Sequence, residues 1–151
     1  MDIPGHSFAV LITFLVFSVP VCVFDIRYKR IPNWIVFAGI IFLFAVRFFY
    51  FQNSPLRMLI DILSGGLIFY VIRLFTKGKL GMGDVKLAAF IALFTGFPLF
   101  FAAVAIASLT GLIFALTGMA LGRINKTTKI PFAPFLTAGS IIVSIINIIF
   151  F

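Results

Sequence analysis

Carboxylates are scarce in this 151-residue sequence, which holds four Asp and no Glu. Two of them, Asp25 and Asp84, each stand where a long apolar stretch meets a basic segment. Two carboxyl groups that share one site cannot both ionise easily, so one keeps its proton while the other remains a base. Such a pair can activate water and protonate the carbonyl of a peptide bond. The alternative is that each aspartate pairs with a neighbouring Lys or Arg at the lipid headgroups.

The residues around Asp84 favour a cavity over a surface ion pair. Gly81 and Gly83 precede it, and glycine lets the backbone adopt conformations that are closed to other residues. Asp84 is also a candidate N-cap for a short helix over 84–96. Because about 12 residues span only about 18 Å, this helix should begin below the headgroups. Irregular backbone at that depth is tolerated where it is buried in protein or lines a cavity.

Two other polar residues are supporting candidates. Lys86 lies two residues after Asp84 and should point to a different helix face, as a lysine that contacts lipid or, alternatively, as a direct site residue. Asn33 is expected to be a cap or turn residue.

Other chemistries have little material in this sequence. Cys22 is the single cysteine, and a Ser–His mechanism would need the single histidine, His6, which is expected on the outer side. No cluster of metal-ligand type is evident, so we expect neither a metal nor a cofactor. Arg57 and Asp61 are four residues apart and should form an ion pair near a helix end. Asp2 is expected to be solvated.

The composition points to a membrane protein. Hydrophobic residues make up 63% of the chain and charged residues only 11%, against roughly 25% charged residues in an ordinary soluble domain. A small soluble domain cannot hide so much apolar surface. A soluble enzyme, a disordered chain and a disulfide scaffold are therefore excluded, and the net charge of +8 indicates topology and lipid contact rather than nucleic acid.

The apolar stretches predict an all-α, polytopic membrane protein with six transmembrane helices. Residues 87–122 carry no charge, and as one helix they would be about 54 Å long, too long for a single crossing. We therefore split this stretch at Thr95-Gly-Phe-Pro98. A retained first helix is preferred over a signal peptide, because the chain has no basic segment before it. The expected spans form one peptidase domain over 1–151, at about 4–24, 32–51, 57–76, 84–96, 99–122 and 131–151.

The cations divide unevenly between the two sides of this arrangement. The loops after the first, third and fifth spans hold ten of the twelve, and the opposite side holds Arg47 and Arg57. Positively charged loops stay in the cytoplasm, so both termini are expected outside. The ten are Arg27, Lys29, Arg30, Arg73, Lys77, Lys79, Lys86, Arg123, Lys126 and Lys129.

Three segments together resemble the type IV prepilin peptidases, which are intramembrane aspartyl proteases of the GxGD type with six core helices. The segments are Asp25-Ile-Arg-Tyr-Lys-Arg-Ile-Pro-Asn33, Gly81-Met-Gly-Asp-Val-Lys-Leu87 and Lys129-Ile-Pro-Phe-Ala-Pro-Phe135. The resemblance covers essentially the whole chain. It implies that Asp25 and Asp84 are the catalytic pair. It also implies a substrate, the basic leader of prepilin-like or archaellin-like precursors, cut at the cytoplasmic face of a prokaryotic plasma (inner) membrane.

One departure from the longer bacterial members bears on a second activity. Those members carry two Cys pairs that bind zinc, and they methylate the new pilin amino terminus, whereas this sequence has only Cys22. It is more similar to the short archaeal or Flp/Tad-type members, so methyl transfer is not expected. The rival interpretation is a small polytopic transport or assembly subunit in which Asp25 and Asp84 bind a proton or a cation. A shared site for the two carboxylates would favour the peptidase.

Overall fold

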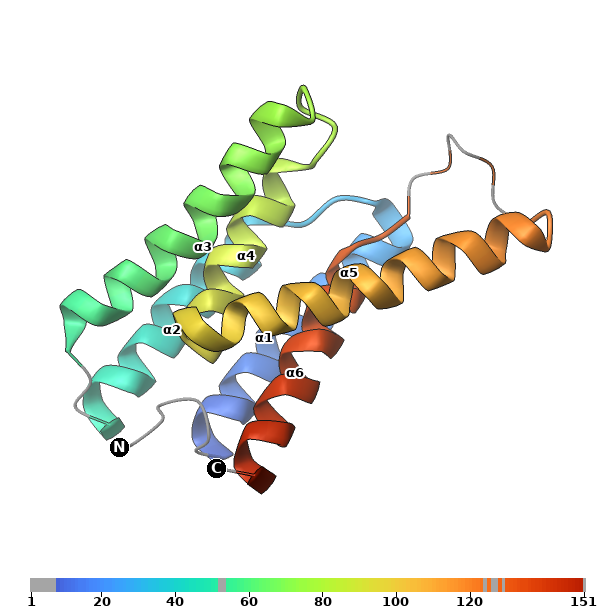
Figure 1. Ribbon diagram of the computed structural model, residues 1–151. Helices are drawn as coiled ribbons and strands as arrows, with labels where there is room; N and C mark the ends of the chain where they lie inside the picture. The colour runs from blue at the N-terminus through green and yellow to red at the C-terminus, as the bar shows by residue number, and fades with distance from the viewer. Residues whose placement is uncertain (1–7, 52–53, 124, 126–127, 129, 151) are drawn as a thin grey trace.

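A computed structural model describes residues 8–51, 54–123, 125, 128 and 130–150 of the chain, and over these it contains six α-helices and no strand (Figure 1). The predicted all-α class is therefore confirmed. The helices are α1 Phe8–Tyr28, α2 Asn33–Phe51, α3 Pro55–Phe75, α4 Met82–Thr95, α5 Phe97–Ala120 and α6 Ala133–Phe150. Asp2, His6, Lys126 and Lys129 lie outside the described residues, as do both ends of the chain.

Three of the six helices, α1, α3 and α5, are long and apolar enough to cross a membrane. Helices α2 and α6 contain the shorter apolar segments Asn33–Phe49 and Ala133–Asn147. The predicted break in the long uncharged stretch is confirmed, because Gly96 alone separates α4 from α5. Gly96 has a φ of +78°, a left-handed conformation that favours glycine.

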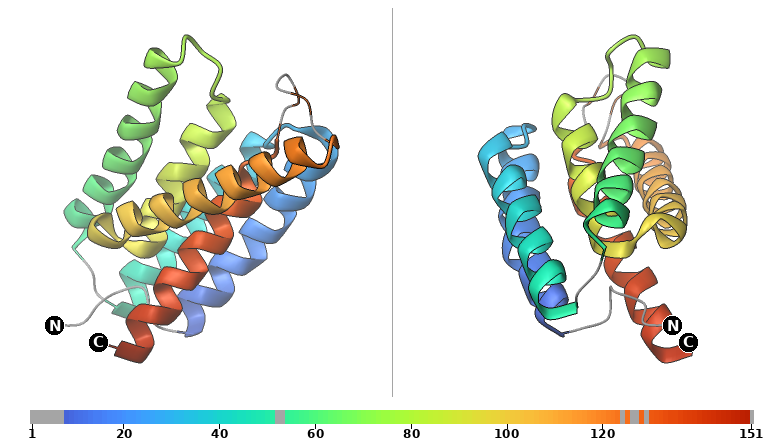
Figure 2. Two further views of the ribbon diagram at one scale, coloured as in Figure 1. Left: turned by 45° about the vertical axis from the view of Figure 1, so that its right-hand side comes forward. Right: turned by 90° about the vertical axis from the view of Figure 1, so that its left-hand side faces the viewer.

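Helix α4 is the centre of the fold and packs against all five other helices. Every residue from Leu87 to Thr95 is buried. A helix that is hydrophobic all round is one that buries its whole circumference, and α4 is of this kind. Its 14 residues give a length of about 21 Å at 1.5 Å per residue. Helices α1 and α2 form a pair on one side of it, and α5 crosses obliquely over α6 on the other (Figures 1 and 2).

The outer helices direct large apolar side chains away from this centre. Exposed examples include Val16 on α1, Ile41 on α2, Leu63 on α3, Ile113 on α5 and Ile149 on α6. So many exposed large apolar side chains mark contact with a membrane or a partner. The apolar helices and this outward-facing surface are those of a multi-pass membrane protein.

The predicted ion pair between Arg57 and Asp61 is wrong. Asp61 is buried and pairs instead with Arg47 of α2, at 3.7 Å between Nη1 and Oδ2, whereas Arg57 is exposed. Spacing along one helix suggested Arg57, but a buried carboxylate needs a partner that is buried with it. Arg47 is only 1% exposed, so it lies inside the bundle and not on the outer surface where the charge count had placed it.

Helix α3 approaches α4 closely at one glycine. A Cβ atom on Gly65 would lie 2.5 Å from the Cβ of Ala92 and 2.8 Å from the carbonyl oxygen of Ala88, which belongs to the backbone and cannot move aside. On the next residue, Gly66, a Cβ would make an ordinary contact of 3.5 Å with Ala89. Of these two adjacent glycines, only Gly65 is therefore required to lack a side chain.

We predict that Gly65→Ala destabilises the protein by about 1–3 kcal/mol relative to Gly66→Ala, the typical cost of overpacking. Both substitutions gain the same helix propensity, so their difference isolates the contact with α4. Unfolding by denaturing detergent in mixed micelles measures it. Equal stabilities for the two variants would show that α3 and α4 do not approach as described.

Candidate active site

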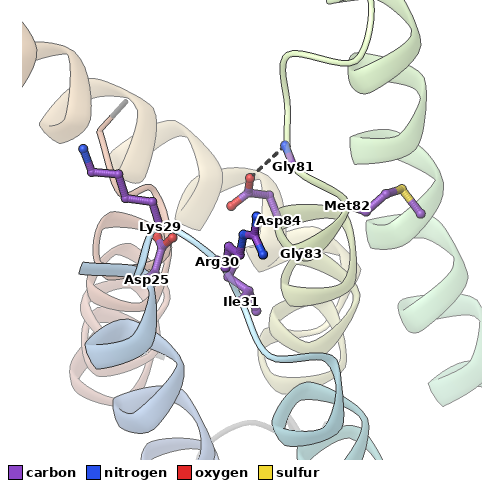
Figure 3. A pocket seen from close by; sticks show the side chains of 8 residues that line it. All are labelled: Asp25, Lys29, Arg30, Ile31, Gly81, Met82, Gly83 and Asp84. Carbon is purple, nitrogen blue, oxygen red and sulfur yellow. Dashed lines mark hydrogen bonds between the residues drawn. The ribbon is translucent and has the colours of Figure 1, made fainter. Parts of the chain in front are cut away.

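Asp25 and Asp84 line one cavity. Asp25 lies near the end of α1 and Asp84 in the first turn of α4, and both border a space of about 260 Å³ (Figure 3). The connection after α1 and the entry to α4 supply the rest of its wall. The lining residues are Asp25, Lys29, Arg30, Ile31, Gly81, Met82, Gly83 and Asp84. Topology thus brings together the two carboxylates that the sequence singled out.

The Asp25 carboxylate is hydrogen-bonded to the start of α6. Its Oδ2 accepts a hydrogen bond of 2.9 Å from the backbone N–H of Ala133, the first residue of α6. The first N–H groups of a helix lack partners within that helix, and its dipole favours a negative charge there. Asp25 is 6% exposed, so this bond ties α1 to α6 inside the protein.

Asp84 is held by its own helix entry. Its Oδ2 accepts a hydrogen bond of 3.2 Å from the backbone N–H of Gly81. The expectation that Asp84 is the N-cap is wrong by three residues, because Gly81 is the N-cap and α4 begins at Met82. A carboxyl group at the third helical position can reach back to the N-cap N–H, and this is the bond observed.

The glycines beside Asp84 have separate steric roles. A Cβ on Gly83 would lie 2.6 Å from the Cβ of Ile31, so the chain after α1 contacts the first turn of α4 directly. A Cβ on Gly81 would lie 2.9 Å from Oδ2 of Asp84 itself. Both predicted glycines therefore border the cavity, and any side chain at Gly83 would push its two walls apart.

The two supporting polar residues do not line the cavity. The Nζ of Lys86 donates a hydrogen bond of 2.9 Å to Oδ1 of Asn33 and lies 5.1 Å from the centre of the Phe37 ring. Lys86 therefore contacts α2, whereas Asp84 lines the cavity. Because Asn33 begins α2, this bond ties α4 to α2 just outside the site.

Sequence reasoning missed Arg30 and Ile31 as residues of the site. Arg30 was counted only for its effect on topology, yet it lines the cavity together with the two aspartates (Figure 3). Their place in the short segment between Asp25 and Pro32 is the signal that could have found them. A connection of so few residues keeps its side chains near both helix ends.

Local ion pairing does not account for either aspartate. Within the part of the chain that the structure describes, the one ion pair within 4.0 Å joins Arg47 and Asp61 and involves neither Asp25 nor Asp84. The same residues bring together no group of three or more His, Cys, Asp or Glu side chains that could hold a metal ion. Two carboxyl groups on one cavity, without a counter-cation in contact, can share a proton and hold a water molecule between an acid and a base.

Comparison with known proteins relates the chain to a family. Residues 9–116 match the sequence model of the type IV leader peptidase family. A protein of Bacillus subtilis (strain 168), called prepilin leader peptidase/N-methyltransferase, is 34% identical over 131 residues, which are 87% of this chain and 53% of that protein. The chain thus spans about half the length of this relative. No solved structure matches the chain.

We predict that cysteines placed at 25 and 84, in a Cys22→Ala background, are joined by a short bifunctional thiol reagent, because both positions border one cavity. Mass spectrometry of the cross-linked peptides detects the product. Arg27→Cys combined with Asp84→Cys is the matched control, since Arg27 is exposed and does not line the cavity. Equal cross-linking of the two pairs would contradict the shared site.

Proposed function

The chain belongs to the type IV leader peptidase family, and on this premise we propose that it is an intramembrane aspartyl endopeptidase. Its substrate is the basic leader of a type IV prepilin-like or archaellin-like precursor. The observation that carries this proposal is that Asp25 and Asp84, from the first and fourth helices, line the same cavity. The shared cavity also favours a catalytic pair over the rival transport subunit, whose carboxylates could lie on separate paths.

In the proposed reaction the two aspartates work as a unit. The ionised carboxylate takes a proton from water as the water oxygen attacks the carbonyl carbon of the scissile peptide. The protonated carboxyl gives its proton to the carbonyl oxygen. The tetrahedral intermediate then collapses, the C–N bond breaks and the amine leaves with a proton returned from the pair. The hydrogen bonds from Ala133 and Gly81 hold one oxygen of each carboxyl group in place during these steps.

We also propose six membrane crossings, with the ends of α1, α3 and α5 on the cytoplasmic side. These three ends lie at the same end of the bundle, as do the cavity and the start of α4 (Figure 2). The described cations near them support this orientation. They are Arg27, Lys29, Arg30, Arg73, Lys77, Lys79, Lys86 and Arg123. With Arg47 buried inside the bundle, Arg57 is the remaining cation near the opposite end among the described residues.

This orientation puts the cavity where the proposed substrate presents its scissile bond. A basic leader stays on the cytoplasmic side for the same electrostatic reason as the basic loops of the enzyme. The apolar segment that follows the leader enters the bilayer, so the bond between them lies at the cytoplasmic face. The membrane is, in this proposal, the plasma (inner) membrane of a prokaryote.

We predict that Asp25→Asn and Asp84→Asn each reduce cleavage of a co-expressed prepilin-like protein by about 10²–10⁴-fold, the contribution typical of a general acid or base. Both variants should insert into the membrane at normal levels, since asparagine keeps the shape of the side chain and an oxygen acceptor. A gel-mobility assay follows leader removal, and the exposed Arg57→Gln is the control that should cleave normally. Efficient cleavage by either asparagine variant rules out the paired mechanism.

We further propose that this chain cleaves without methylating its product. The charged residues of the described segments that join the helices at the cavity end are all Lys or Arg, whereas a site for a methyl donor needs several converging polar groups. Purified protein, supplied with substrate and a methyl donor, should release a product with a free amino terminus. Mass spectrometry decides the matter, and a terminal methyl group on the product would contradict this prediction.

A further inference from the structure

The junction between α4 and α5 is a helix break inside the bundle. Helix α4 ends at buried Thr95, Gly96 turns the chain, and α5 begins at Phe97. Such a break leaves backbone carbonyl groups free at the end of one helix and N–H groups free at the start of the next. In a protein surrounded by lipid these groups need partners within the protein.

Local bonds satisfy part of this need. The N–H of Gly96 bonds to the carbonyl of Ala92 at 2.9 Å, and the N–H of Phe100 bonds to the carbonyl of Gly96 at 3.0 Å. The hydroxyl of Thr95 turns back to the carbonyl of Ile91 at 3.0 Å. Two groups bond to other helices instead. They are the carbonyl of Leu93, in the last turn of α4, and the N–H of Phe97, at the start of α5.

Arg47 and Asp61 are those partners. From α2, the Nη1 of Arg47 donates to the carbonyl oxygen of Leu93, and from α3, Oδ1 of Asp61 accepts a 3.1 Å hydrogen bond from the N–H of Phe97. Each charge suits the helix end that it meets, because the dipole favours a cation at the C-terminus and an anion at the N-terminus. The two side chains also pair with one another at 3.7 Å.

Helices α2, α3, α4 and α5 therefore meet at one buried ion pair. This pair contacts the C-terminal end of α4, and Asp84 lies in the first turn of the same helix. Helix α4 is one continuous helix from Met82 to Thr95, so an axial shift at one end moves the other end equally. A shift by one residue amounts to about 1.5 Å. Misplacement of a catalytic group by about 1 Å can cost about 10²-fold in rate.

We propose that Arg47 and Asp61 are a positioning pair for peptide cleavage. By capping both sides of the α4–α5 break, they fix the axial position and the rotation of α4, and so the position of Asp84 relative to Asp25. This rests on the proposed peptidase function. A purely stabilising role is the alternative. The two roles predict different effects on kcat when both charges are removed together and the protein stays stable.

The double variant Arg47→Met/Asp61→Leu separates them. It leaves no unpaired charge, and exchange of a buried ion pair for apolar residues is often neutral for stability. Both caps are lost, however. We expect kcat for a prepilin-like substrate to fall by at least about tenfold with KM unchanged, because the substrate-binding surface is intact. Arg47→Lys, which keeps a cationic donor, should retain most of the wild-type kcat.

A second readout does not depend on activity. Spin labels on cysteines at Tyr28 and Met82, both exposed, report the distance between the end of α1 and the start of α4 in a Cys22→Ala background. We expect this distance to shift or broaden in the double variant and to stay unchanged in Arg57→Gln. If the wild-type protein cleaves no prepilin, the proposed function fails, and this distance still decides whether the pair positions α4.

Phe97→Pro offers a test with both charges in place. Proline is favoured at the first position of a helix, yet it removes the N–H that donates to the Asp61 carboxylate. It should lower kcat relative to Phe97→Ala, which keeps that N–H, and this comparison stands even if the double variant fails to fold. An unchanged distance between the labels in the double variant, or equal kcat values for Phe97→Pro and Phe97→Ala, overturns the proposal.

Discussion

Helix α4 has to be buried on every side, and the rest of the structure follows from this constraint. Its residues from Leu87 to Thr95 are buried and all five other helices contact it. A central helix cannot be placed by a contrast between a polar and an apolar face, because it has none. Its position must come from specific contacts at its two ends and from steric fit along its length, such as the approach of α3 at Gly65.

The surrounding lipid makes hydrogen-bond partners necessary at the helix ends. In water, the free backbone groups at a helix end can bind solvent, whereas inside an apolar bundle they need donors and acceptors supplied by the protein. The chain has few polar side chains, and it uses several of them at helix ends. Asp84 bonds to the entry of α4, Asp25 to the start of α6, Asp61 to the start of α5 and Arg47 to the last turn of α4.

The sequence could predict features that depend on neighbouring residues, but not contacts between residues on different helices. Apolar length and the Thr95–Pro98 breaker are local, so the helices and the α4–α5 break were predictable, and the glycines before Asp84 pointed to its cavity. Partners from other helices leave no local trace. Asp61 was paired with Arg57 of its own helix when its partner is Arg47, and the bond of Asp25 to the N–H of Ala133 involves backbone, which no residue type reveals.

The two buried aspartates, Asp25 and Asp61, differ in what surrounds their carboxyl groups. Asp25 and Asp61 both accept a hydrogen bond from the first residue of a helix to which they do not belong, so capping alone does not distinguish them. Asp61 faces a cation, Arg47, which neutralises it. Asp25 instead shares a cavity of about 260 Å³ with a second carboxylate. A neutralised carboxylate has little reason to exchange protons, whereas a carboxylate beside space for water can take part in proton transfer. The ion pair of Asp61 and the cavity beside Asp25 and Asp84, more than burial, therefore support the proposal that Asp25 and Asp84 are the pair for hydrolysis.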